Sequence, residues 1–214
     1  MAASPTASTQ LAIDPAQPDP PVDPYDLLIH AVAPRPIAFV STLSSDGKPN
    51  LAPFSFFMAG GANPPSICFS PNTKEDGAPK DTLRNIRETG EYVVHIVSHA
   101  MGPGMSATSK ALPHGESEWP LSGFTPIPSV KVKPPRVAEA PFAMECRLHA
   151  IMPHGTGGDA ANYIIGEVVM FHVSPQVLTD GKPDPMKIDC LARLGGPWYL
   201  RAVPDALFTM QRPS

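Results

Sequence analysis

The stretch PRPIAFVSTLSSDGKPNLAPFSFF, residues 34–57, decides the fold of this chain. Residues 37–42 form an apolar, β-branched and aromatic run, which is typical of a strand buried on both faces. A polar turn, SSDG at residues 44–47, follows, and residues 50–57 resume a strand pattern. The stretch therefore predicts a hairpin in a β-rich domain.

Pro53 interrupts the second strand of this hairpin. Proline has no N–H to give to a ladder, so the strand is expected to leave its neighbour there and to expose the peptide groups of Asn50, Leu51 and Ala52. Such groups are costly to bury unless something else bonds to them. A flat heterocycle with donors and acceptors along one edge would satisfy them, although an ordinary proline at a sheet edge explains the same pattern.

Eight segments recur in order along residues 25–203, and together they carry a family resemblance. They are PRPIAFVST, DGKPNLAPFSFF, NPP, KDTLRNI, TGEYVVHIV, MECRL, GEVVMFHV and LARLGGPWY. In this order and spacing the chain resembles the flavin reductase-like family of FMN-binding split barrels. The resemblance is specific because the segments recur in register, whereas each one alone would be weak.

The resemblance implies a mainly β fold, an antiparallel split β-barrel of Greek-key type with a few short helices. It also implies a homodimer with one FMN per subunit near the interface. The domain is expected over residues 25–214. Residues 1–24 are rich in Pro, Ala, Ser, Thr and Asp and are expected to form an extended or mobile arm.

Residues 81–89 are predicted to form a helix. Asp81 is placed as its N-cap, Leu83 and Ile86 form an apolar stripe at helical spacing, and Gly90 supplies a left-handed C-terminal residue. The start of the helix, with Lys80 and Thr82, could hold a phosphate through free amides and the helix dipole. A simple capped helix with an exposed lysine is the alternative, and the resemblance favours the phosphate.

The residue patterns and the resemblance together nominate a set of cofactor-binding residues. No catalytic side chain is nominated, because the isoalloxazine ring of FMN carries the redox chemistry. The segment RLGGPWY is included because its counterpart in the family comes near the flavin. The candidates are Ser41, Thr42, Asn50, Leu51, Ala52, Ser55, Ser70, Lys80, Asp81, Thr82 and Arg193.

Two other site types are excluded. The segment GPGMSA, residues 102–107, mimics a dinucleotide fingerprint, but no βαβ unit follows it. His95 lies on a predicted strand and His99 directly follows it; in extended chain, residues four apart are about 13 Å from each other, so no metal is assigned. A nicotinamide nucleotide is expected to stack over the flavin in an open cleft, with residues 155–158, residues 101–109 and His172 as rim candidates.

Further strands are predicted at residues 91–98, 142–152, 163–173 and 199–203, with short extended pieces at 130–132 and 136–137. The loop at residues 154–159 is predicted to be a hairpin turn, or alternatively a flap beside a ligand. Glu145 and Glu167 lie within apolar strands. They are expected to pair with Arg147 or Arg193, or to be satisfied at a subunit interface.

Composition excludes several classes of protein. Charged residues make up 17% of the 214 residues, the net charge is −4, and no basic run indicates nucleic acid or an anionic membrane as a partner. No apolar run is long enough to span a bilayer, and no signal peptide is recognised. Cys68, Cys146 and Cys190 are interpreted as free thiols, which suits the cytoplasm.

The sequence thus predicts an FMN-binding oxidoreductase, an NAD(P)H-dependent flavin reductase-like protein whose acceptor is free flavin or a monooxygenase. An FMN electron carrier of the flavoredoxin type is the alternative. A pyridoxamine phosphate oxidase-like barrel shares the architecture but not these motifs. The choice between NADH and NADPH and the identity of the acceptor stay open.

Overall fold

A computed structural model describes residues 10–213 of the chain; residues 1–9 and 214 lie outside this description. The predicted arm over residues 1–24 therefore falls partly outside the described residues. Residues 10–23 form turns and irregular chain, and the Asp23 carboxylate accepts a hydrogen bond from the Tyr25 amide at the start of the first helix.

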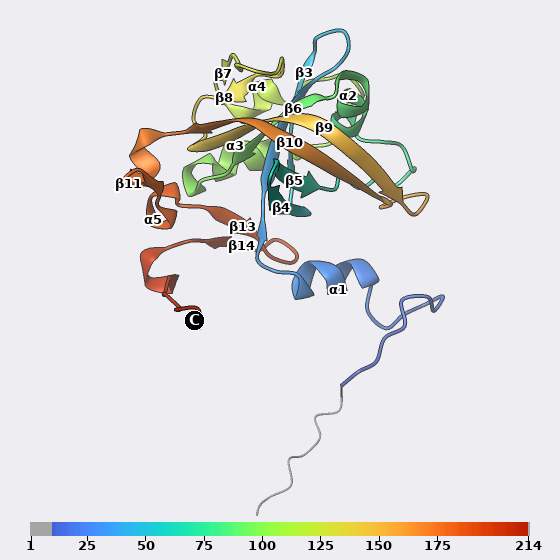
Figure 1. Ribbon diagram of the computed structural model, residues 1–214. Helices are drawn as coiled ribbons and strands as arrows, with labels where there is room; N and C mark the ends of the chain where they lie inside the picture. The colour runs from blue at the N-terminus through green and yellow to red at the C-terminus, as the bar shows by residue number, and fades with distance from the viewer. Residues whose placement is uncertain (1–9, 214) are drawn as a thin grey trace, which may run out of the picture.

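A seven-stranded sheet dominates the structure (Figure 1), and all its strand pairs are antiparallel. Its strand order is β3-β2-β6-β9-β10-β5-β4. The strands are β2 (Ala38–Leu43), β3 (Pro49–Phe54), β4 (Phe57–Ala62), β5 (Pro65–Phe69), β6 (Glu91–Ile96), β9 (Phe142–His154) and β10 (Ala161–Val173).

Three small sheets accompany it. β1 (Arg35–Pro36), β13 (Leu191–Arg193) and β14 (Tyr199–Arg201) form one of them, which lies near α1 in Figure 1. The others are β7 (Pro126–Ile127) with β8 (Arg136–Val137), and β11 (Leu178–Thr179) with β12 (Lys182–Pro183).

The helices are short, as predicted, and in the described part of the chain none is long and apolar enough to cross a membrane. They are α1 (Pro24–Ala31), α2 (Asp81–Thr89), α3 (Gly102–Ala107), α4 (Trp119–Ser122) and α5 (Pro185–Ile188), with 3-10 turns η1 (His99–Met101), η2 (Pro175–Val177) and η3 (Pro204–Ala206). The GPGMSA segment is α3, and the βαβ unit that a dinucleotide fingerprint needs does not surround it.

The core has two main clusters because β2 is buried on both faces. Val40 and Phe69 belong to the cluster that packs against Leu83 and Ile86 of α2. Phe39, from the other face of β2, packs in the second cluster with residues of α3 and α4. The prediction of a buried strand at residues 37–42 is confirmed for residues 38–42, whereas Ile37 is buried but lies just before β2.

Strand β3 is an edge strand, and this position explains how the strand accommodates its two prolines. Ser41 faces Leu51 and Leu43 faces Pro49, so alternate residues of β3 share one orientation. Pro49, Leu51 and Pro53 have the orientation that turns the backbone nitrogen away from β2, because proline cannot donate to the ladder. Within β3, all of which is described, Leu51 therefore carries the only outward N–H. The expectation that Asn50 and Ala52 also expose their amides is wrong, because both face β2.

The strands differ in several places from the predictions. The strand expected over residues 50–57 ends at Phe54, and β4 begins at Phe57 as a separate strand paired with β5. Residues 130–132 form no strand, whereas the piece at residues 136–137 is confirmed as β8. All three cysteines are free thiols, of which Cys146 is buried.

Residues 130–132 instead bind the Glu145 carboxylate, which is 0% exposed. The amides of Val130, Lys131 and Val132 donate to it at 2.7, 2.5 and 3.2 Å. His172 Nε2 lies 2.6 Å from Oε1.

The expected pairing of Glu145 with Arg147 or Arg193 is wrong. The arginine near it is Arg136, whose Nε is 3.9 Å from Glu145 Oε1. Burial alone raises the pKa of this carboxyl. The hydrogen bonds from the amides and from His172 outweigh burial, and they hold the pKa of Glu145 below its usual range. Glu167 is exposed.

We expect Glu145→Gln to lower the free energy of unfolding at pH 7 by about 2 to 4 kcal/mol, because it removes a buried charge that accepts hydrogen bonds from three backbone amides. A lowered pKa in the folded state means that the carboxylate stabilises the fold above its unfolded pKa, about 4.3. This stabilisation is lost as the pH falls through the folded pKa. Denaturant unfolding between pH 3 and 7 should therefore show the variant and the parent converging in acid.

Glu167→Gln on the neighbouring strand β10 is the matched control, since its side chain is exposed. It should change the free energy of unfolding by less than about 0.5 kcal/mol. A stability gap between Glu145→Gln and the parent that is the same at every pH would contradict the role assigned to the Glu145 charge.

Candidate functional site

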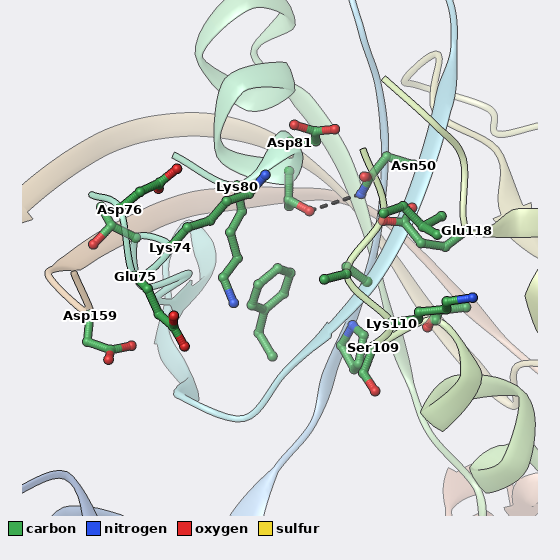
Figure 2. Close-up of a pocket in the computed structure, with 18 residues that line it drawn as sticks. Asn50, Lys74, Glu75, Asp76, Lys80, Asp81, Ser109, Lys110, Glu118 and Asp159 are labelled. Atoms are coloured by element: carbon green, nitrogen blue, oxygen red, sulfur yellow. Dashed lines mark hydrogen bonds between the residues drawn. The ribbon is translucent and has the colours of Figure 1, made fainter. Parts of the chain in front are cut away.

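A cavity of about 660 Å³ opens between strand β3, the start of α2 and three loops. Its size lies within the range of small-molecule and cofactor sites. Figure 2 shows Lys74, Lys80 and Asp159 on one side of it and Ser109, Lys110 and Glu118 on the other. The cavity therefore brings together charged side chains from segments that are far apart in the sequence.

The N-terminus of α2 opens toward this cavity, because Lys80, Asp81 and Thr82 line it. The first backbone bond of the helix runs from the Arg84 amide to the Lys80 carbonyl at 3.1 Å. The amides of residues 81–83 precede that bond and have no partner within the helix. They present donors at the positive end of the helix dipole, which favours an anion. The predicted helix over residues 81–89, with Gly90 in the left-handed region at φ 69°, is confirmed.

The prediction that Asp81 is the N-cap is wrong. Lys80 occupies the cap position, and Asp81 is the first helical residue. The Asp81 carboxylate binds a distant loop: His114 Nδ1 lies 2.7 Å from Oδ1, and the Gly115 amide donates to Oδ2 at 2.9 Å. Burial alone raises the pKa of Asp81, but the bonds from Gly115 and His114 outweigh it and keep the pKa below its usual range. Asp81 thus fastens a distant loop to the start of α2.

Lys80 contributes a partly desolvated ammonium group. Burial lowers the pKa of Lys80 below its usual range, and its Nζ lies 5.9 Å from the centre of the Phe54 ring. Among the described residues, no carboxylate lies within 4.0 Å of this nitrogen. Lys80 is therefore a cation available to a ligand in the cavity.

The outward amide of Leu51 meets a carboxylate at the cavity wall. It donates to Glu118 Oε2 at 3.2 Å. The Asn50 side-chain amide lies 3.0 Å from Thr82 Oγ1. The orientation that satisfies both ends of this amide turns its nitrogen toward Glu118 Oε2, at 3.2 Å, and its oxygen toward Thr82. Burial raises the pKa of Glu118.

Five of the nominated cofactor-binding residues line this cavity. They are Asn50, Ala52, Lys80, Asp81 and Thr82. Leu51 does not line the cavity: its amide donates to Glu118, which does, and its side chain is buried in the second core cluster.

Three of the other nominated residues lie away from the cavity lining. The hydroxyl of Ser41 is buried and has no hydrogen-bond partner among the described residues. Thr42 Oγ1 accepts a bond from Asn85 Nδ2 at 2.9 Å. The guanidinium group of Arg193 stacks on the Tyr199 ring at 4.6 Å.

The hydroxyl groups of Ser55 and Ser70 accept hydrogen bonds outside the cavity lining. Ser55 Oγ accepts from Arg35 Nε at 3.4 Å, and Ser70 Oγ accepts from the Asn162 amide at 3.0 Å. Their role toward a cofactor, like that of Ser41, Thr42 and Arg193, stays a prediction.

Six charged residues of the cavity are not among the residues nominated from the sequence, namely Lys74, Glu75, Asp76, Lys110, Glu118 and Asp159. They lie in irregular segments, where no periodic pattern gives the direction of a side chain. A weak signal existed for Asp159, because the glycine-rich loop before it was considered as a flap. That loop does adjoin the cavity, and Thr73 Oγ1 donates to the Gly157 carbonyl at 2.5 Å.

The rim candidates for a nucleotide cleft divide in the same way. Thr108 and Ser109, at the end of the segment 101–109, line the cavity, whereas residues 155–158 do not and only the next residue, Asp159, does. His172 instead faces Glu145 and lines a separate cavity of about 530 Å³ beside Arg136. The structure thus does not bring His172 to the candidate site.

The fold and the site define a class before any comparison is made: an antiparallel β domain with an anion-receptive cavity at the edge of its main sheet. The model of the flavin reductase-like domain family matches residues 30–186. The chain belongs to the flavin reductase-like family, as its sequence motifs indicated. This membership places it among flavin-related oxidoreductases with an antiparallel split-barrel fold, and it supports flavin binding.

Solved structures agree. Component B of nitrilotriacetate monooxygenase from Bacillus cereus is 36% identical, with a TM-score of 0.87, over 95% of this chain and 100% of that one. The 2-nitrobenzoate 2-nitroreductase of Pseudomonas fluorescens is 30% identical, with a TM-score of 0.77, over 89% and 92%. Flavoredoxin of Desulfovibrio vulgaris is 25% identical, with a TM-score of 0.69, over 84% and 91%.

Proposed function

We propose that this protein binds FMN and acts as an NAD(P)H-dependent flavin reductase-like oxidoreductase. The observation that carries the proposal is the start of α2, which opens into the cavity beside the Lys80 ammonium group. Free helical amides together with a cation form a site for a phosphate group. FMN carries a phosphate and riboflavin does not, so this end of the cavity favours FMN.

The residues of the cavity fit such a cofactor. Its volume accommodates a ligand of this class, and the wall formed by Ala52, Pro53 and Phe54 is apolar and suited to a flat ring. When bound, FMN supplies the capacity to accept a hydride and to pass electrons on. The described residues contribute binding, orientation and exclusion of water, and no side-chain nucleophile or base is assigned.

The donor and the acceptor are part of the same proposal. A nicotinamide nucleotide lies against one face of the ring, with the loops that carry Ser109 and Asp159 at the rim of the cavity. The acceptor is free flavin or a monooxygenase, which the similarity to component B of nitrilotriacetate monooxygenase supports. A cytoplasmic location is proposed because a reducing compartment suits three free thiols.

A non-turnover electron carrier is the second candidate function, and the similarity to flavoredoxin favours it. Both candidates use the same FMN site and differ only in whether NAD(P)H reduces the bound flavin. Kinetics with the nucleotides therefore separate them.

A homodimer is also proposed. Strand β4 is the free edge of the main sheet, and its residues after Phe57 are exposed. By register, Met58 of β4 and Tyr163 and Met152 of β10 and β9 lie on one sheet face, where they are 60%, 43% and 58% exposed. An unprotected edge beside exposed apolar side chains is suited to pairing with a second copy.

We expect Lys80→Ala to weaken FMN binding by about tenfold or more, because it removes one charge-assisted contact to the phosphate. Riboflavin affinity should change by less than about twofold, because riboflavin lacks the phosphate and makes no such contact with Lys80. Titration followed by flavin fluorescence measures both constants. Lys48→Ala is the control, because Lys48 is exposed and pairs with Asp46 outside the cavity. Equal affinity of the parent for FMN and riboflavin would overturn the phosphate assignment.

We expect NADH or NADPH to bleach the absorbance of the bound flavin in anaerobic stopped-flow mixing, with recovery when oxygen or free flavin is added. Direct reduction requires the nicotinamide at near-attack distance, about 3 to 3.5 Å from the ring, which an open cavity allows. If neither nucleotide reduces the flavin while a protein reductant does, the carrier function is correct and the reductase function is not.

Light scattering at micromolar concentration should give twice the 22.7 kDa chain mass. Met58→Asp should shift the protein toward the monomer, because it places a charge in the apolar contact. Leu121→Asp, at an exposed residue of α4 away from this sheet face, should leave the mass unchanged. A monomer mass for the parent would contradict the dimer.

A further inference from the structure

Residues 109–118, called here the strap, connect α3 to α4 along the side of the cavity. Residues 109–112 and Glu118 line the cavity directly, whereas His114 and Gly115 lie on the far side of Asp81. Two carboxylates fasten the strap. Asp81 of α2 holds His114 and Gly115, and Glu118 of the strap binds the Leu51 amide of β3.

The second of these fastenings lies within the proposed cofactor site. Leu51 supplies the outward N–H of β3, and the Asn50 amide nitrogen lies 3.2 Å from the same carboxylate oxygen. A backbone amide and a side-chain amide thus converge on one carboxylate, and N–H donors of this kind bind phosphate oxygens elsewhere in proteins.

These donors adjoin the proposed phosphate position. Asn50 links the two, because its amide contacts Glu118 on one side and Thr82 Oγ1, at the first turn of α2, on the other. A phosphate at the start of α2 therefore stands close to the Glu118 carboxylate. Burial already disfavours the ionised form of Glu118. A second negative group in the same cavity disfavours it further, because like charges in a partly desolvated site repel strongly.

We propose that the Glu118 carboxylate is an internal competitor for the phosphate of the cofactor, holding the Leu51 and Asn50 donors until the phosphate displaces it. This rests on the proposed function and adds to it a regulation of the same site. Because Glu118 ends the strap, its displacement loosens the strap at one of its two fastenings. Phosphate binding is thereby coupled to the loop that forms one wall of the cavity.

Removal of Glu118 changes the affinity for phosphorylated ligands in opposite directions, depending on whether Glu118 competes with phosphate or has only a structural role. If Glu118 only satisfies the edge of β3, its removal leaves ligand affinity unchanged or weakens it through disorder of the strap. If it competes with phosphate, its removal tightens the binding of phosphorylated ligands alone. Riboflavin and FMN separate the two, because they share the ring and the ribityl chain and differ in the phosphate.

The test uses full-length Glu118→Gln and Glu118→Ala with flavin fluorescence titrations. Glu118→Gln removes the charge but keeps an oxygen that accepts the hydrogen bond from the Leu51 amide. It therefore tests the proposal even if Glu118→Ala is unstable. We expect the FMN dissociation constant to fall by about 5- to 20-fold in either variant, the range set by one charged contact. The riboflavin constant should change by less than about twofold.

Glu116→Gln is the matched control on the same strap, since no hydrogen bond or ion pair is recorded for its side chain in the described part of the chain and it does not line the cavity. It should leave both constants unchanged. Inorganic phosphate gives an independent readout. It should raise the thermal midpoint of Glu118→Gln more than that of the parent, because ligand binding to the folded state stabilises it.

FMN affinity that is unchanged or weaker in both Glu118 variants overturns the proposal, as does equal tightening of FMN and riboflavin. Failure of the phosphate assignment itself is distinguishable. In that case the parent binds FMN and riboflavin equally, and Lys80→Ala has no selective effect. A parent that prefers FMN through Lys80, with no gain on loss of Glu118, keeps the proposed function and rejects only the competitor.

Discussion

The edge of strand β3 is the constraint on which the site depends. An edge strand presents backbone donors to whatever lies outside it, and an unpaired donor invites unwanted pairing. Pro49 and Pro53 remove two of the three outward nitrogens, and Leu51 keeps the third. Glu118 then satisfies that one amide from another segment. The protected edge is thus also the place where a polar ligand can enter into hydrogen bonds.

Two buried charges hold together the parts of the domain that lie outside the main sheet. Glu145 gathers the loop at residues 130–132 onto strand β9 through backbone amides. Arg35, which is 4% exposed, donates to carbonyls of Ile29 and Val32 around the end of α1 and to the Leu194 carbonyl beyond β13. In both cases one buried charge is satisfied by several backbone groups, so irregular chain acquires a defined position without a hydrophobic core of its own.

The two carboxylates that hold the strap differ in what they respond to. Asp81 lies at the start of α2, where the helix dipole and its bonds to the strap favour the ionised form. Glu118 sits deeper at the cavity wall, where burial disfavours that form. The proposed displacement of Glu118 would therefore leave the strap fastened by Asp81.

The sequence by itself determined the family, the positions of most strands of the main sheet and the helix at residues 81–89, because these depend on local periodicity and on motifs such as KDTLRNI. It also located Lys80 and Thr82 beside the cavity, since the start of a helix is a local property. It could not find Glu118, Lys74 or Asp159, or place Arg136 and His172 rather than Arg147 beside Glu145. Those positions lie in loops or depend on strand register. Only tertiary packing decided them, because a buried carboxylate takes the donors that neighbouring segments bring within reach, whatever their distance along the chain.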